Sequence, residues 1–105
     1  MEFEWDHNKN HTNFAKHGFN FADAEEVFKG YVFAWPDQRK DYGEERWIGM
    51  GVLGEEIVLM VWTMRPTNRV RMISMRKAGK REWEIYRKAV QKRHGQNSGN
   101  KGRGY

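Results

Sequence analysis

Arg69-Val-Arg-Met-Ile-Ser-Met-Arg-Lys-Ala-Gly-Lys-Arg-Glu-Trp-Glu-Ile-Tyr86 carries the strongest structural signal in this chain. In its first half, cations alternate with apolar residues, which is typical of a strand, and its second half changes to helical spacing. A strand that carries Arg71 and Arg76 must expose both side chains somewhere. Because a guanidinium group presents donors that match a phosphate, the stretch predicts a strand, a helix and a polyanionic partner.

Charge is divided unevenly along the 105 residues. Residues 65–105 hold 13 Lys or Arg and two Asp or Glu, whereas residues 1–64 hold 6 and 12, respectively. Such asymmetry indicates an acidic ligand for the basic half. A solvated charged surface would have the same composition, but arginines inside a strand pattern favour a binding function.

Length and composition limit the class of protein. A chain of 105 residues is one domain with a modest core. It has no cysteine, so disulfides and thiolate metal sites are excluded. No apolar run approaches the roughly 20 residues that span a bilayer, and residues 1–5 lack a signal-peptide core. We expect a cytoplasmic protein without membrane contact and without a cofactor.

Periodicity and turn residues predict helices and strands in separate blocks. The elements expected before Arg69 are a strand over 2–5, helices over 8–17 and between Asn20 and Gly30, and strands over 31–35, 46–53 and 57–63. The strand over 57–63 is the most apolar and should be central. Short connections predict that the last three strands form an antiparallel meander. The final helix should run from about Lys80 to Arg93.

This order of elements indicates the α+β class. We expect two N-terminal helices packed on one face of a four- to five-stranded, mainly antiparallel sheet, and a C-terminal helix. The other face should stay partly open and charged. The folded domain is expected to cover residues 1–94, and the basic, Gly- and Asn-rich residues 95–105 are expected to form a disordered tail.

The first predicted helix is very polar. Lys9, Lys16 and His17 share one of its faces by their spacing, together with Asn13. A helix of this kind needs solvent or a ligand over most of its surface.

His7 and His11 are four residues apart on the same predicted helix, so both imidazoles could contact one metal ion. No third ligand has a fixed relation to them in the sequence. We therefore predict no metal site.

Taken together, these features resemble the BrnT family. The residues that carry the resemblance are Phe3-Glu-Trp-Asp6, Lys9, Asn13, Lys16-His-Gly18, Phe21, Ala24, Val27-Phe28, Glu45-Arg-Trp47, Gly49 and the run from Arg71 to Tyr86. They extend over about residues 2–90. No single motif among them is specific, but the ordered set is. One departure is Gly79, where many members carry Ser or Thr before the last helix.

The resemblance implies a RelE-like fold and a small RNA-cleaving toxin of a bacterial type II toxin–antitoxin pair. It also implies a partner, usually a ribbon-helix-helix antitoxin, in an expected 2:2 heterotetramer. Promoter DNA would be bound only through this antitoxin.

Metal-independent RNA cleavage uses the 2′-hydroxyl as nucleophile and needs cations that stabilise the phosphate as charge develops. Arg76 is the first candidate for this role. By strict alternation it shares a strand face with Ser74 and Met72, while Arg71 lies on the opposite face unless a bulge intervenes. We predict that Arg71, Ser74 and the adjacent Lys77 bind RNA. The alternative for Arg71 is an ion pair with a helix carboxylate.

The same reaction needs an acid and a base, which add about 10²–10⁴-fold. His17 is the first candidate because histidine titrates near neutrality, although it could instead satisfy helix-terminal carbonyl groups. Lys9 and Lys16 would bind phosphates, or simply keep the helix solvated. Arg46 is a further catalytic cation, or a partner of Glu45 or Asp41.

Glu82 and Tyr86 lie four residues apart on the last predicted helix and share a face. Glu82 could act as a base, but a bridge from Glu82 to Arg76 or Arg81 is slightly favoured. Tyr86 is a catalytic candidate whose more common role is packing, because it lies on the same apolar side of the helix as Trp83.

Two classes of function remain. One is a metal-independent endoribonuclease that inhibits translation and growth. The alternative is a non-catalytic nucleic-acid-binding or co-repressor module that acts with a DNA-binding antitoxin.

Overall fold

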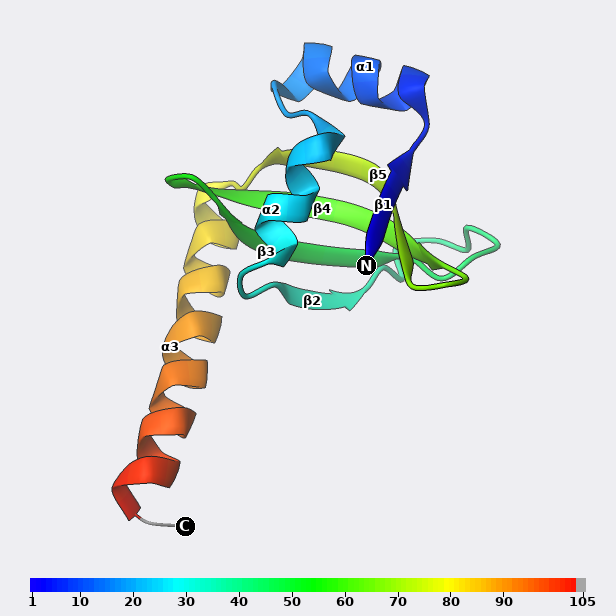
Figure 1. Ribbon diagram of the computed structural model, residues 1–105. Helices are drawn as coiled ribbons and strands as arrows, with labels where there is room; N and C mark the ends of the chain where they lie inside the picture. Colours follow the sequence, from blue (N-terminus) through cyan, green and yellow to red (C-terminus); the bar gives the residue numbers. More distant parts are fainter. Residues whose placement is uncertain (104–105) are drawn as a thin grey trace.

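The computed structural model describes the backbone of residues 1–103 and side chains through His94, and it is an α+β domain, as predicted (Figure 1). Its elements are β1 (Glu2–Trp5), α1 (His7–His17), a 3₁₀ turn (Phe21–Asp23), α2 (Ala24–Phe28), β2 (Phe33–Pro36), β3 (Trp47–Leu53), β4 (Glu56–Arg65), β5 (Arg69–Lys77) and α3 (Lys80–Arg103). No helix within the described part of the chain is long and apolar enough to cross a bilayer.

The five strands form one mixed sheet in the order β1-β5-β4-β3-β2. β4 is its central strand, which confirms the prediction from its apolar sequence. The β2–β3, β3–β4 and β4–β5 pairs are antiparallel, and β1 runs parallel to β5. In this parallel pair Glu4 lies opposite Arg71, and Phe3 lies opposite Val70. Two alternating patterns therefore meet in register, with acids beside arginines on one face and apolar residues together on the other.

A β-bulge in β5 changes the faces that were expected from alternation. Val61 pairs with Ser74 and Trp62 pairs with Met72, so Ile73 has no partner on β4. The extra residue shifts the alternation by one. Arg71, Ser74 and Arg76 therefore pair with Thr63, Val61 and Leu59, which alternate along β4 and share one face of the sheet.

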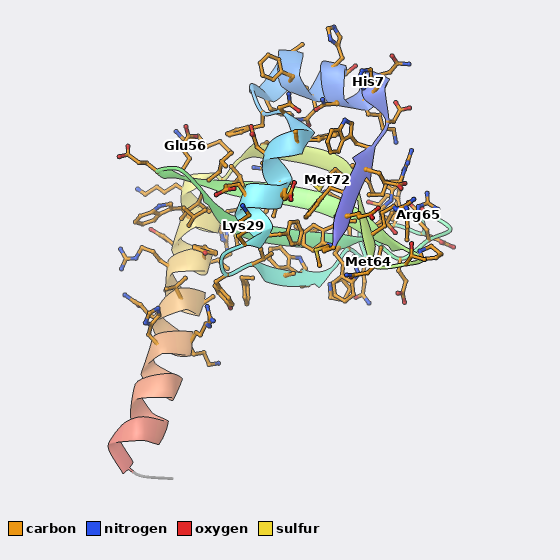
Figure 2. All side chains as sticks on the ribbon, in the orientation of Figure 1. His7, Lys29, Glu56, Met64, Arg65 and Met72 are labelled. Atoms are coloured by element: carbon orange, nitrogen blue, oxygen red, sulfur yellow. The ribbon has the colours of Figure 1, made fainter. Side chains whose placement is uncertain are left out.

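Met72 does not share the face of Arg76, and the prediction that it would was wrong. It is almost fully buried in the core on the α2 side of the sheet (Figure 2). The same bulge brings Arg71 to the face of Arg76, which was the exception allowed by the sequence analysis.

The larger core cluster lies between α2 and the sheet. Phe21, Ala24 and Val27 pack there against strand side chains that include Met60 and Trp62. Asn20 caps the 3₁₀ turn that leads into α2, because its side chain accepts a hydrogen bond from the Ala22 N–H at 3.0 Å. Two glycines of β3 allow the Trp62 ring and Val27 of α2 to lie close to this strand. A Cβ added at Gly49 would lie 2.5 Å from the Trp62 ring, and one added at Gly51 would lie 2.5 Å from Val27 Cγ1.

α1 begins and ends at the residues that the sequence indicates. The Asp6 carboxylate accepts a hydrogen bond from the Lys9 N–H at 2.9 Å, and Gly18 ends the helix with a φ of 78°. The helix lies along the edge of β5, beyond the end of β1, and of the two N-terminal helices it is α2 that covers a face of the sheet (Figure 1). From the sequence, both N-terminal helices were expected on one face of the sheet.

α3 starts on the opposite face of the sheet. Tyr86 belongs to a second buried cluster there with Met50 and Leu59, and its hydroxyl donates to the Tyr31 carbonyl at 2.9 Å. The Arg93 guanidinium lies 4.6 Å from the Tyr31 ring centroid. Beyond this contact the helix projects from the domain (Figure 1).

α3 ends at Arg103 rather than near Arg93. Residues 94–103 contain no proline that would interrupt its backbone hydrogen bonds. The predicted tail over 95–105 includes Gly104 and Tyr105, which lie outside the described residues. Disorder of this segment in solution stays a prediction.

Candidate functional site

An open hollow of about 390 Å³ lies between α1 and the bulged part of β5. Its lining residues are Asn8, Lys9, Thr12, Asn13, Lys16 and His17 from α1, and Ile73 and Ser74 from β5. The two lysines and the histidine of the predicted polar face therefore line one concave surface, and all three are exposed. This is the helix surface that was expected to need either solvent or a ligand.

Asn13 attaches α1 to the edge of β5. Its Nδ2 donates to the Met75 carbonyl at 2.8 Å and to the Phe19 carbonyl at 3.2 Å, and its Oδ1 accepts from the Met75 N–H at 3.1 Å. β1 has already ended at this level, because its last pair is Trp5 with Met72. One buried side-chain amide therefore satisfies the strand edge that β1 leaves open.

Helical spacing groups Asn13 with Lys9 and Lys16 on one face of α1, and it does not predict this anchoring contact. An asparagine between lysines on a polar helix is compatible with both roles. Only the neighbouring strand edge distinguishes them, and the helix sequence does not contain that information.

Arg76 is paired with Glu82 in a two-pronged ion pair. Arg76 Nη1 lies 2.9 Å from Glu82 Oε1 and Nη2 lies 2.7 Å from Oε2. Hydrogen bonding to Arg76 is the main reason that the pKa of Glu82 is lowered, and the same bonds raise the pKa of Arg76. Arg76 keeps 39% of its side-chain surface exposed. This bridge was the interpretation favoured from the sequence over a role for Glu82 as a free base.

Glu82 also accepts a hydrogen bond from the Gly79 N–H at 2.7 Å. This contact is the backbone half of a capping box. The contact satisfies the Gly79 N–H at the start of the helix. Glycine itself costs only a few tenths of a kcal/mol at this position, so it can stand where a Ser or Thr would otherwise begin the helix.

Arg71 donates to Glu4 at 2.8 Å. The alternative considered from sequence was an ion pair with a helix carboxylate, but the partner comes from β1. About a third of the Arg71 side chain stays exposed, on the same sheet face as Arg76. The signal for this pair was present in the sequence, in the matching alternation of residues 2–5 and 69–72.

Arg46 lies just before β3 and is held by neighbours within its own loop. Its Nε lies 2.9 Å from Glu44 Oε2, and its guanidinium lies 4.1 Å from the Tyr42 ring centroid. The carboxylate partner is thus Glu44 rather than Glu45 or Asp41.

Two further candidates lie apart from the hollow. Tyr86 is 6% exposed, and its pKa is raised mainly by burial. Lys77 pairs with Val58, whose side chain is in the α2-side core, so it emerges on the face opposite to Arg76. The described part of the chain holds no group of three His, Cys, Asp or Glu side chains that could bind a metal, and none forms around His7 and His11.

The loop that carries Arg46 starts at a buried acid, Asp37, and this gives a pH prediction. Hydrogen bonds from Arg39 are the main cause that lowers the pKa of Asp37 from 3.8 to about 2. A lowered pKa stabilises the folded state above the unfolded value, and this stabilisation is lost as the pH falls from about 4 to 2. Because Arg39 is largely exposed, we expect a contribution on the order of 1–2 kcal/mol.

Urea unfolding of Asp37→Asn between pH 2 and 7 checks this expectation. The variant should be less stable than the unsubstituted protein at pH 7, and the difference should shrink toward pH 2. Asp41→Asn removes a charge from the same loop and should keep the original pH profile. A constant difference between Asp37→Asn and the unsubstituted protein across this range would contradict the assignment.

The structure thus gathers Lys9, Lys16, His17 and Ser74 around one hollow. Arg76 is two residues from Ser74 on the same strand face, or roughly 7 Å along the strand. The fold and the site define a small α+β domain with an open, cation-lined surface where a helix meets a sheet edge.

Comparison with known proteins identifies the family. The family described as "Ribonuclease toxin, BrnT, of type II toxin-antitoxin system" matches residues 5–82. A crystal structure of the Brucella abortus ribonuclease toxin BrnT is similar, with a TM-score of 0.63 and 29% sequence identity, and the match covers 76% of this chain and 99% of that chain. The search of curated proteins gives no match. The chain belongs to the BrnT family of ribonuclease toxins, and this membership implies an antitoxin partner.

Proposed function

We propose that this chain is a metal-independent endoribonuclease of RelE-like type that cleaves RNA by attack of the 2′-hydroxyl on the adjacent phosphate. The observation that carries the proposal is the hollow itself. It joins exposed lysines, a histidine and a serine to a strand face that presents two arginines. This combination supplies the positive charge and the proton-transfer group that the reaction needs.

In this mechanism Arg76 stabilises the negative charge that builds up on the phosphate, and Lys9 and Lys16 hold the RNA backbone. Glu82 fixes the plane of the Arg76 guanidinium through its two hydrogen bonds. His17 exchanges the proton with the 2′-hydroxyl or with the leaving oxygen. Ser74 and Arg71 contact neighbouring phosphates on the same sheet face.

The basic hollow is also the surface on which we expect the antitoxin to bind, with acidic or bulky residues. An antitoxin that covers Lys16 and His17 would block access of RNA. We expect a ribbon-helix-helix protein, a 2:2 complex and promoter binding through the antitoxin alone. A complex in which this surface stays fully open would contradict the proposal.

Incubation of the purified protein with RNA in the presence of EDTA tests the reaction. Attack by the 2′-hydroxyl should give fragments that end in a cyclic phosphate or a 3′-phosphate, and chelation should leave the rate unchanged because no step uses a metal. The ends can be identified by mass spectrometry. An RNA with 2′-O-methyl groups is the matched control and should stay intact.

Intact RNA under these conditions, with normal folding and RNA binding, would instead favour the non-catalytic alternative. That alternative gains support from the ion pairs that already occupy Arg71 and Arg76 in the protein alone. Expression without the antitoxin gives a second readout, since a co-repressor should cause little growth defect.

A further inference from the structure

Most of α3 lies beyond the residues that the family match covers. The family match ends at residue 82, so α3 beyond its first turn lies outside it. The Brucella structure is matched over 99% of its own length, yet this uses only 76% of the present chain.

α3 is basic, and it exposes an aromatic ring. Residues 80–94 hold six Lys or Arg and two Glu. Trp83 is 43% exposed and belongs to neither core cluster. The Arg87 guanidinium lies 5.1 Å from the centroid of the Trp83 ring. Lys80 is three residues before Trp83, so Lys80, Trp83 and Arg87 form one stripe along the helix, here called the Trp83 stripe.

We propose that the Trp83 stripe is a docking site for single-stranded RNA outside the catalytic hollow. One base stacks on the Trp83 indole, and Lys80 and Arg87 contact the flanking phosphates. An exposed aromatic ring between cations is the combination that binds single strands without sequence preference. This inference rests on the proposed function only in taking RNA as the ligand.

The stripe is connected to the catalytic surface through the start of α3. Glu82, the partner of Arg76, directly precedes Trp83 in the first turn of the helix. The ion pair between Arg76 and Glu82 therefore fixes the position of the Trp83 stripe relative to Arg76. An RNA strand held at Arg76 has a cationic helix beside it along which it can continue.

The distribution of apolar residues argues against a helical protein partner for this surface. Trp83 and Ile85 are the large exposed apolar residues of the described side chains of α3. Their spacing of two puts them on different sides of the helix, so they do not form the a/d seam that a partner helix requires. The charge of the helix is complementary to a polyanion.

Binding of a fluorescent 20-nucleotide single strand with 2′-O-methyl riboses tests the inference by anisotropy. This probe cannot be cleaved by 2′-hydroxyl attack, so binding is measured independently of catalysis. Trp83→Ala in the full chain should weaken binding by about 5- to 140-fold, the range that follows from loss of one stacked base. Trp83→Phe should restore most of the affinity because a ring remains.

Arg87→Gln and Lys88→Gln form a matched pair. Each removes one positive charge, and the two positions, although adjacent in sequence, lie on different sides of the helix. Arg87→Gln should reduce the slope of log affinity against log salt by about 0.7, the value for one phosphate contact on a single strand. Lys88→Gln should leave the slope unchanged. Circular dichroism should show the same folding for all variants, because Trp83 lies outside the core.

The inference is overturned if Trp83→Ala binds the probe within twofold of the unsubstituted protein, or if both charge variants weaken binding equally. It is also overturned if Trp83→Ala abolishes antitoxin binding and leaves RNA binding intact. Lack of RNA cleavage by the unsubstituted protein would count against the proposed function alone, since the anisotropy result stands by itself.

Discussion

Arg76→Ala is expected to reduce RNA cleavage by about 10²–10³-fold, the usual effect of removing one group that stabilises transition-state charge. Arg76 is half-exposed, and its partner Glu82 can be hydrated when the guanidinium is absent. The variant should therefore stay folded, and the loss should appear in kcat rather than in stability. Cleavage kinetics and a thermal melt measured on the same preparation check both parts.

Lys77→Ala is the matched control, because it removes the next cation along β5 from the opposite face. Its activity should stay within about threefold of the unsubstituted protein, an effect of the size expected for a surface substitution. Arg76→Lys should recover only part of the rate, since lysine keeps the charge but not the planar fork. If Arg76→Ala loses RNA binding and activity in parallel, the chain acts as a binding module. If it cleaves at the normal rate, Arg76 is not the catalytic cation.

Asn13→Ala is expected to lower the free energy of unfolding by about 2–4 kcal/mol, because it leaves the N–H and carbonyl of Met75 without their partner. The same change should lower activity at temperatures where the variant is still folded. The amide joins α1 directly to β5, so its loss should loosen the spacing between Lys16 or His17 on α1 and Ser74 on β5. Urea unfolding and single-turnover cleavage measure the two effects.

Asn8→Ala provides the comparison, since Asn8 is exposed on the same helix and lines the same hollow. Its stability should change by less than about 0.5 kcal/mol. Asn13→Asp separates the two halves of the contact. An aspartate can still accept from the Met75 N–H, but its buried carboxylate faces the Met75 and Phe19 carbonyls without a donor, so Asn13→Asp should be no more stable than Asn13→Ala at neutral pH. Equal stability of Asn13→Ala and the unsubstituted protein would show that other contacts hold α1.

The amino-acid sequence was sufficient where the determining chemistry is local. Asp6 and Gly18 begin and end α1 because a carboxylate cap and a left-handed glycine act within one helical turn. β4 could be predicted as central because a run of apolar residues must be buried on both faces. The lysines and the histidine of α1 were grouped correctly because helical spacing alone determines which side chains share a face.

Only the tertiary structure decided how the arginine strand presents its cations. The bulge at Ile73 depends on how β4 pairs with β5, and one unpaired residue moves every later side chain to the other face. Asn13 and Glu4 acquire their partners from β5, which lies more than sixty residues away in the chain. Periodicity describes neighbours along one element, whereas strand register and the pairing of charges depend on segments that meet only when the chain has folded.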